Sequence, residues 1–76
     1  MTLTELEAAL AADGFTPGRP DEIIAQADEQ FVQQASCPNC QHQGMEYHGY
    51  LDRTRYPHDG YRSVAVCPSC DEAVEF

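Results

Sequence analysis

Two identical Cys-Pro-x-Cys turns carry the clearest chemical capacity of this chain. The first turn supplies Cys37 and Cys40, and the second supplies Cys67 and Cys70. Each turn brings two sulfurs toward one centre, and the proline after the first cysteine fixes φ and stiffens the turn. Four thiolates are the number and type of ligand that close a tetrahedral zinc site. The spacing therefore predicts one zinc ion per chain, held by two turns that are far apart in the sequence.

A closed four-thiolate site is structural, because it leaves no position open for water or substrate. Iron is the alternative metal, since tetrahedral sulfur ligands also suit it. Two disulfides are the alternative use of four cysteines, and they are typical of secreted chains. A secreted chain begins with a signal peptide, which needs an unbroken apolar run. Acidic residues interrupt the apolar positions of residues 1–15, so the sequence predicts no signal peptide. His42 could replace a cysteine as ligand, although four cysteines already complete the set. We therefore expect reduced thiols, a bound metal and a cytoplasmic protein.

Residues 37–76 resemble a zinc ribbon with rubredoxin-like knuckles, on the two Cys-Pro-x-Cys turns and the two strand-like segments between them. The resemblance implies an antiparallel ribbon held by zinc. Ribbons of this kind serve transcription, translation, enzymes and adaptors alike, so the resemblance specifies the site better than the function. Rubredoxins usually have glycine directly after the second cysteine of each knuckle, whereas Gln41 and Asp71 stand there in this chain, which also has no tryptophan. This difference disfavours a rubredoxin-like electron carrier.

Arginines and tyrosines alternate in the stretch that joins the two central segments. Such a combination can stack bases or form a protein-binding hot spot. Three acidic residues balance the three arginines of residues 46–62, which favours a protein partner over nucleic acid. The predicted partner contacts are Arg53, Arg55, Tyr56, His58 and Arg62.

The charge of the chain points the same way. Thirteen acidic residues against four arginines and no lysine give a formal net charge of −9. One zinc ion on four thiolates adds two further negative charges. This field repels a phosphate backbone and disfavours non-specific binding to nucleic acid. No segment of the sequence is long and apolar enough to predict a membrane span.

The second half of the chain reads as three strands. Alternating side chains predict a first strand over residues 45–51 and a second over residues 61–66, joined by a polar stretch that ends in an Asp-Gly turn signal. Residues 73–76 can add a short third strand after the second knuckle. The sequence therefore predicts a three-stranded antiparallel ribbon over residues 36–76.

The first half reads as two short helices, over residues 2–12 and 21–35. Thr4 with Glu7 fits a capping box, and Thr2 with Glu5 is an alternative capping box that begins two residues earlier. Residues 15–20 contain two prolines and a glycine, which predicts a connector without regular structure. We expect a helical hairpin over residues 1–35.

The second helix has an apolar stripe at i, i+3 and i+7, formed by Ile24, Ala27 and Phe31 and widened by Ile23 and Val32. Two interpretations remain open for the apolar residues of both helices. The helices pack on each other and on one face of the ribbon, or part of the stripe docks a partner protein or a second copy of this chain.

Together these features predict an α+β protein with an N-terminal helical hairpin and a zinc ribbon. His58 beside Asp59 has no accompanying nucleophile or phosphate-binding glycine pattern, so we expect no enzyme activity. The function that we expect is that of a regulatory or adaptor module which binds another protein, with a possible homodimer through the helical arm. The alternatives are a ribbon associated with nucleic acid or transcription, which would use the arginines and tyrosines, and an electron carrier.

Overall fold

The central element of the structure is an antiparallel β-hairpin. The computed structural model describes residues 1–56 and 58–76. In chain order the elements are α1 (Leu3–Ala12), β1 (Thr16–Pro17), α2 (Glu22–Gln34), β2 (Glu46–Leu51), β3 (Tyr61–Val66) and β4 (Ala73–Glu75). Strands β2 and β3 form the hairpin and pair along their whole length, from Glu46 opposite Val66 to Leu51 opposite Tyr61. All three predicted strand segments are thus strands of one sheet; Pro57, in the predicted connecting stretch, lies outside the described residues.

The sheet has a fourth strand, β1, whereas the sequence predicts only three strands. β1 pairs antiparallel with β2, and the sheet order is β1-β2-β3-β4. The sequence predicts no regular element here because of Pro17 and Pro20, but proline is tolerated on an edge strand, whose outer side needs no hydrogen-bond donor. The Gly18 N–H donates to the Gly49 carbonyl at 3.0 Å and extends the pairing. The connector therefore belongs to the sheet.

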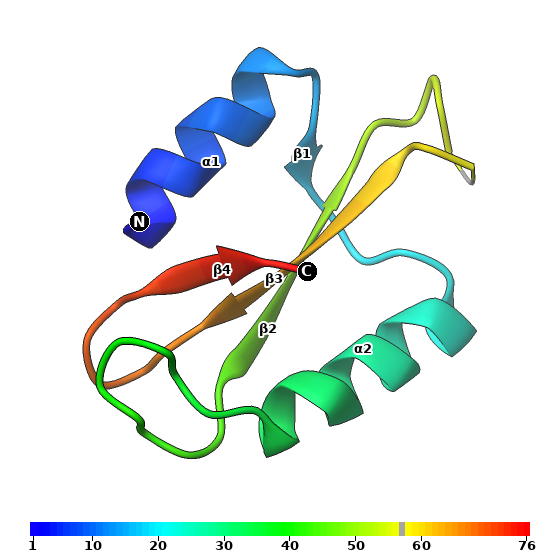
Figure 1. The fold of residues 1–76 in the computed structure, drawn as a ribbon. Coiled ribbons are helices and arrows are strands. Elements are labelled where there is room, and N and C mark those ends of the chain that lie inside the picture. Colours follow the sequence, from blue (N-terminus) through cyan, green and yellow to red (C-terminus); the bar gives the residue numbers. More distant parts are fainter. Residues whose placement is uncertain (57) are drawn as a thin grey trace.

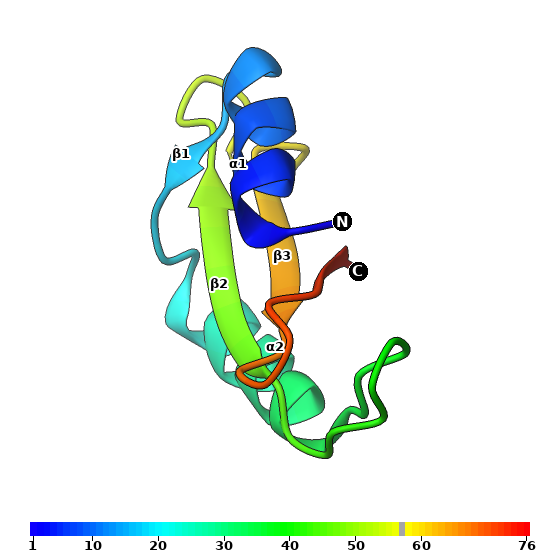
Figure 2. The same ribbon diagram turned by 90° about the vertical axis from the view of Figure 1, so that its left-hand side faces the viewer.

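The two helices lie on opposite faces of the sheet (Figure 1). Leu6 and Leu10 of α1 share a buried cluster with Val64 of β3. Val32 of α2 shares a separate cluster with Ala65, the next residue of β3, whose side chain points to the other face. Figure 2 looks onto the sheet, with α1 in front of it and α2 behind it. The predicted helical hairpin is therefore wrong: the chain leaves α1, passes the sheet edge as β1 and reaches α2 on the far face.

Helix α1 begins with a capping box, at the earlier of the two predicted positions. The Glu5 N–H donates to the Thr2 hydroxyl at 3.3 Å, and the Thr2 N–H donates to the Glu5 carboxylate at 3.2 Å. The start of the helix is also tied to the sheet, because the Ala73 N–H of β4 donates to the Met1 carbonyl at 2.8 Å.

Among the described residues, neither α1 nor α2 combines the length and hydrophobicity that crossing a membrane requires.

Helix α2 buries Val32 of the predicted apolar stripe and, beside it, Ala25, which the stripe does not include. Ala25 and Val32 are fully buried, whereas Phe31 is 61% exposed and Ala27 is exposed. Ile24 is half-buried at the border between these faces. The predicted stripe of larger apolar residues therefore lies mainly toward solvent.

The face of α2 that meets the sheet includes an aspartate with a hydrogen-bond partner. Asp28 lies on the same stripe as Ala25 and Val32, at i+3 from Ala25, and the buried Ser63 hydroxyl of β3 donates to its carboxylate. A carboxylate on a sheet-facing side is tolerated when it has a hydrogen-bond partner. From the sequence pattern alone, a helix face that contains an aspartate is not expected to be buried, because the pattern does not show that Ser63 is available as a hydrogen-bond partner.

Asp52 organises the turn that follows β2. Its carboxylate accepts from the Thr54 hydroxyl at 2.7 Å, from the Thr54 N–H at 3.0 Å and from the Arg55 Nε at 2.7 Å. These donors, the Thr54 hydroxyl above all, lower the pKa of Asp52 to about 2 from its ordinary value of 3.8. Because the pKa is lower in the folded state, this stabilisation is present at neutral pH and is lost only as the pH falls from 3.8 toward about 2.

Asp52→Asn should therefore lower the melting temperature at neutral pH by a few degrees, because the amide replaces a carboxylate that accepts three hydrogen bonds. Asp59→Asn is the matched control, since it makes the same charge change in the same turn at an exposed position. Thermal unfolding of both variants with zinc bound measures the effect. Equal melting temperatures for the two variants would contradict this role of Asp52.

Candidate metal centre

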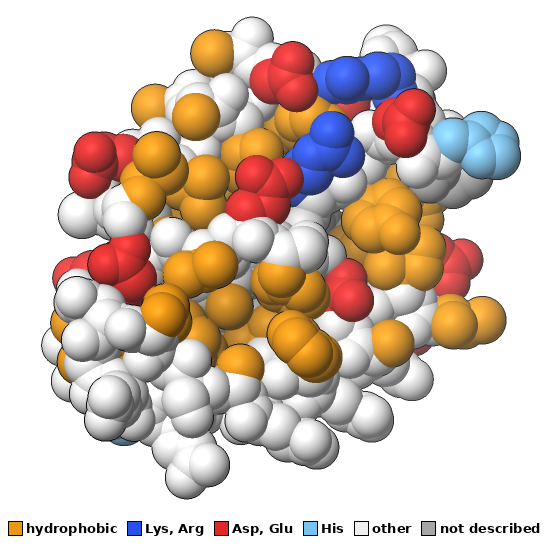
Figure 3. Space-filling view, viewed as in Figure 1, with side chains coloured by type: hydrophobic (Ala, Val, Ile, Leu, Met, Phe, Trp, Pro, Cys, Tyr) orange, Lys and Arg blue, Asp and Glu red, His pale blue; other side chains and the backbone are white. Residues whose placement is uncertain are grey.

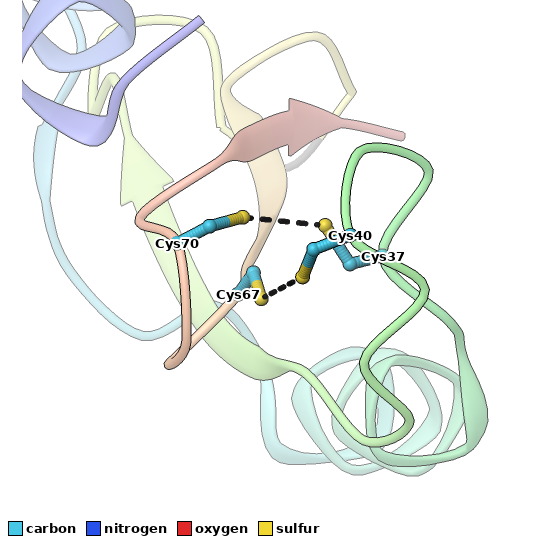
Figure 4. A group of neighbouring side chains, drawn as sticks. All are labelled: Cys37, Cys40, Cys67 and Cys70. Carbon is cyan, nitrogen blue, oxygen red and sulfur yellow. Dashed lines mark hydrogen bonds between the residues drawn. The ribbon is translucent and has the colours of Figure 1, made fainter.

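The antiparallel hairpin brings the two cysteine turns to one end of the sheet. The first turn lies between α2 and β2, and the second lies between β3 and β4. Because Glu46 at the start of β2 pairs with Val66 at the end of β3, the turns before β2 and after β3 are neighbours. Figure 4 shows the four cysteine side chains pointing toward one another from these two turns.

The sulfur atoms are spaced as a tetrahedral thiolate site requires. All four lie within 4.8 Å of one another; Cys40 and Cys67 are 3.5 Å apart, and Cys37 and Cys70 are 3.6 Å apart. A zinc–sulfur bond of about 2.3 Å in a regular tetrahedron places the sulfurs about 3.8 Å apart. Cys37 and Cys67 are buried, whereas Cys40 and Cys70 lie at the surface. The cluster could therefore hold a metal ion.

The two turns have the same backbone hydrogen bonds. In the first turn the Gln41 N–H donates to the Cys37 carbonyl at 2.8 Å, and in the second the Asp71 N–H donates to the Cys67 carbonyl at 3.0 Å. The N–H two residues after each buried cysteine, from Asn39 and from Ser69, donates to that cysteine's sulfur at 3.4 Å. Such donors stabilise a thiolate that binds a metal. The repeated sequence motif thus folds into a repeated sulfur-binding turn.

The side chain of Asn39 links the two turns. Its amide Nδ2 donates to the sulfur of Cys70 on the other turn at 3.6 Å. This donor, with the Glu72 backbone N–H, lowers the pKa of the Cys70 thiol to about 7. The Cys40 thiol behaves differently: the backbone N–H of His42 lowers its pKa, but the neighbouring Cys67 thiol and burial raise it to about 12. Sequence reasoning missed Asn39, and its place inside the first turn is the only signal that points to it.

Asn39→Ala should weaken metal binding by about 10-fold to 100-fold, the usual effect of losing a donor to a ligand atom. The backbone N–H of residue 39 still donates to Cys37, so the turn itself is retained. Ser69→Ala is the matched control at the equivalent position of the second turn. Competition with a chelator of known affinity measures the zinc affinity of both variants. The role of the Asn39 amide would be excluded if the two variants released zinc equally.

The residues that replace the rubredoxin glycines have the conformation that glycine favours. Gln41 has φ 62° and Asp71 has φ 60°, and both follow the second cysteine of their turns. A side chain with positive φ is strained by about 1–2 kcal/mol, and aspartate tolerates it better than glutamine does. Each turn therefore has, directly after its second cysteine, a backbone conformation that glycine favours but a residue with a side chain occupies.

Gln41→Gly should stabilise the zinc-bound protein by about 1 kcal/mol, because relief of strain exceeds the entropy that glycine adds to the unfolded chain. Asp71→Gly should give a smaller gain. Gln43→Gly serves as the control, since Gln43 is not among the residues with positive φ and should be destabilised by the change. Chemical denaturation in excess zinc measures the free energy of unfolding of all three variants. A loss of stability in Gln41→Gly would contradict the assignment of strain.

The histidines lie outside the metal cluster. The four cysteines form the only close group of three or more metal-ligand side chains in the described part of the chain. His42 is exposed, and its carbonyl rather than its ring contributes to the first turn by accepting from the Cys37 N–H at 2.9 Å. His48 is half-buried on β2 and His58 is exposed.

The predicted partner contacts divide into two groups. Arg55 and Arg62 make intramolecular ion pairs, with Asp52 and Glu75 respectively, and both guanidinium groups lie against the ring of Phe15, at 4.8 and 4.6 Å from its centroid. The Tyr56 hydroxyl accepts from the Asp21 N–H at 2.7 Å. Arg53 and His58 are exposed. The contact surface stays a prediction.

Comparisons of the chain with protein-family models, curated proteins and solved structures found no match. The functional argument therefore rests on the site itself. Four clustered cysteines on two sulfur-binding turns are consistent with a zinc-binding module.

Proposed function

We propose that the chain is a small acidic zinc-binding module that presents a surface to another protein, as a regulatory or adaptor component. The observation that carries the proposal is the closed set of four cysteines at one end of the sheet. Four thiolates bind zinc without an open position, so the metal stabilises the fold and takes no part in catalysis. A 76-residue chain with a four-stranded sheet gains much of its stability from such a metal.

The proposed contact surface lies on the turn after β2 and its neighbours. It comprises Arg53, Arg55, Tyr56, His58 and Arg62, the residues predicted from the sequence. The strongly acidic composition supports a protein rather than a nucleic acid as the partner. Zinc fixes the hairpin, and the hairpin fixes the turn that carries this surface.

A pull-down with the tagged, zinc-loaded protein tests the proposal. The double variant Arg53→Ala/His58→Ala removes two exposed side chains and leaves the ion pairs of Arg55 with Asp52 and of Arg62 with Glu75 in place. Gln33→Ala on α2 is the control. We expect one stoichiometric protein partner that survives nuclease, is retained by the control and is lost by the double variant. If the partner is no longer recovered after nuclease treatment, the adaptor function is contradicted and a ribbon associated with nucleic acid is indicated.

A further inference from the structure

The outer face of α2 carries an apolar stripe that lies mainly toward solvent. Ile23 is 81% exposed and Phe31 is 61% exposed, and the exposed Ala27 lies midway between them. These three residues are spaced at i, i+4 and i+8, so they form one ridge along the helix. The ridge lies roughly opposite Ala25 and Val32, which face the sheet.

The Phe31 side chain continues the apolar surface onto the sheet. Its ring lies 5.3 Å from the ring of Phe76, between centroids, and Phe76 follows β4. Val74 and Phe76 are themselves partly exposed. Figure 3 shows hydrophobic side chains gathered between β4 and α2. The stripe therefore has an apolar flank that a partner helix would also contact.

The stripe is uncharged, although the chain has a net charge of −9. The nearest residues on the outer face of α2 are glutamines, at positions 26, 30 and 34. Of the acidic residues on this helix, Glu22 and Glu29 lie to one side and pair with Arg19, and Asp28 is held by Ser63 on the inner side. Among the described residues, the acidic side chains of α2 therefore lie off this ridge. A basic partner would find no carboxylate of α2 on the ridge to pair with, and a second copy of the chain would place no carboxylate of α2 against another there.

The spacing of the stripe is also complementary to itself. When two identical helices cross antiparallel about a two-fold axis, the central residue meets its own copy and the outer residues exchange places. Here the small Ala27 would lie on the axis and permit close approach, while Ile23 would pack against Phe31 of the second copy.

We infer that a second copy of this chain docks on the Ile23, Ala27 and Phe31 ridge and forms a two-fold symmetric dimer through α2. The inference goes beyond the proposed adaptor function, because it uses neither the cysteines nor the turn after β2. A 13-residue helix is about 20 Å long, so the interface lies near the lower end of the area that stable dimers bury, about 1,000 Å² in total. The dimer is therefore weak and dissociates on dilution.

Sedimentation equilibrium of the zinc-loaded protein over a concentration series from about 5 µM to about 500 µM, around the weak-affinity range of small interfaces, tests this inference. Ala27→Glu places two carboxylates against each other at the axis, and glutamate retains the helix. Gln33→Glu makes the same charge change on the exposed surface of α2 away from the ridge. We expect dimers for the natural chain and for Gln33→Glu at high concentration, and a dissociation constant raised at least 10-fold in Ala27→Glu.

Three results would overturn the inference, of which the first two concern the oligomeric state. One is a natural chain that stays monomeric over the whole series; the other is a dimer that Ala27→Glu leaves as stable as before. Capture of a different protein by the ridge, in a chain that remains monomeric, would also overturn it while leaving the adaptor function intact. Loss of the partner in Arg53→Ala/His58→Ala bears on the adaptor function alone, so the two proposals fail separately.

Discussion

Cys67→Ser should abolish the folded state at neutral pH and room temperature. Cys67 is fully buried, and its sulfur accepts from the Ser69 N–H, so a hydroxyl at this position replaces a metal ligand at the centre of the site. Structural zinc contributes on the order of 10–16 kcal/mol in small zinc-binding peptides, whereas a domain as a whole is stable by about 5–15 kcal/mol. Loss of tight zinc binding therefore exceeds or equals the net stability that this chain can have.

Circular dichroism and amide chemical-shift dispersion, with and without zinc, measure this effect. Ser69→Ala is the control, because it changes an exposed side chain in the same turn and leaves the four thiolates in place. We expect native spectra for the control and an unfolded spectrum for Cys67→Ser in both conditions. A Cys67→Ser variant that keeps native strand signals and binds no zinc would show that the metal is not structural.

Phe15→Ala should have the largest effect outside the metal centre, a loss of about 3–5 kcal/mol. Phe15 is 1% exposed and packs in the buried cluster under α1 with Leu10 and Val64. The guanidinium groups of Arg55 and Arg62 also lie against its ring, and each such contact adds about 0.5–1 kcal/mol at partly exposed sites. Removal of the ring therefore leaves a cavity and two arginines without their aromatic partner.

Chemical denaturation in excess zinc measures this loss, and Phe15→Leu separates its two causes. Leucine keeps most of the buried apolar volume but has no ring for the guanidinium groups, so its loss of stability should be less than half that of alanine. We expect the order of stability to be natural chain, Phe15→Leu, Phe15→Ala. A loss below about 1 kcal/mol in Phe15→Ala would contradict the central position of this ring in the core.

The sequence predicted those features that depend on local pattern. Residues 61–66 form β3 as predicted because alternating side chains are a direct consequence of strand geometry. The four cysteines converge because an antiparallel hairpin necessarily places the turn before its first strand beside the turn after its second. Both inferences need only residue types and spacing.

The sequence did not predict features that depend on contacts between distant segments. Thr16 and Pro17 form a strand only because the open edge of β2 is available to pair with them. That strand carries the chain past the sheet edge and so separates the helices, which a hairpin prediction cannot anticipate. The buried face of α2 likewise depends on Ser63, which is far from Asp28 in sequence. The sequence pattern therefore did not indicate that Asp28 lies on the sheet-facing side of α2.

Titration of the reduced protein with Co²⁺, followed by absorption and by displacement with Zn²⁺, tests the four-thiolate site most directly. Cobalt takes the same tetrahedral ligands and reports the number of thiolates through its sulfur-to-metal charge-transfer bands. We predict one ion per chain, a spectrum typical of four thiolates in tetrahedral geometry, formation of native structure on binding, and stoichiometric displacement by zinc. A folded chain that binds no ion, or binds it with the weak spectrum of octahedral oxygen ligands, would contradict the account.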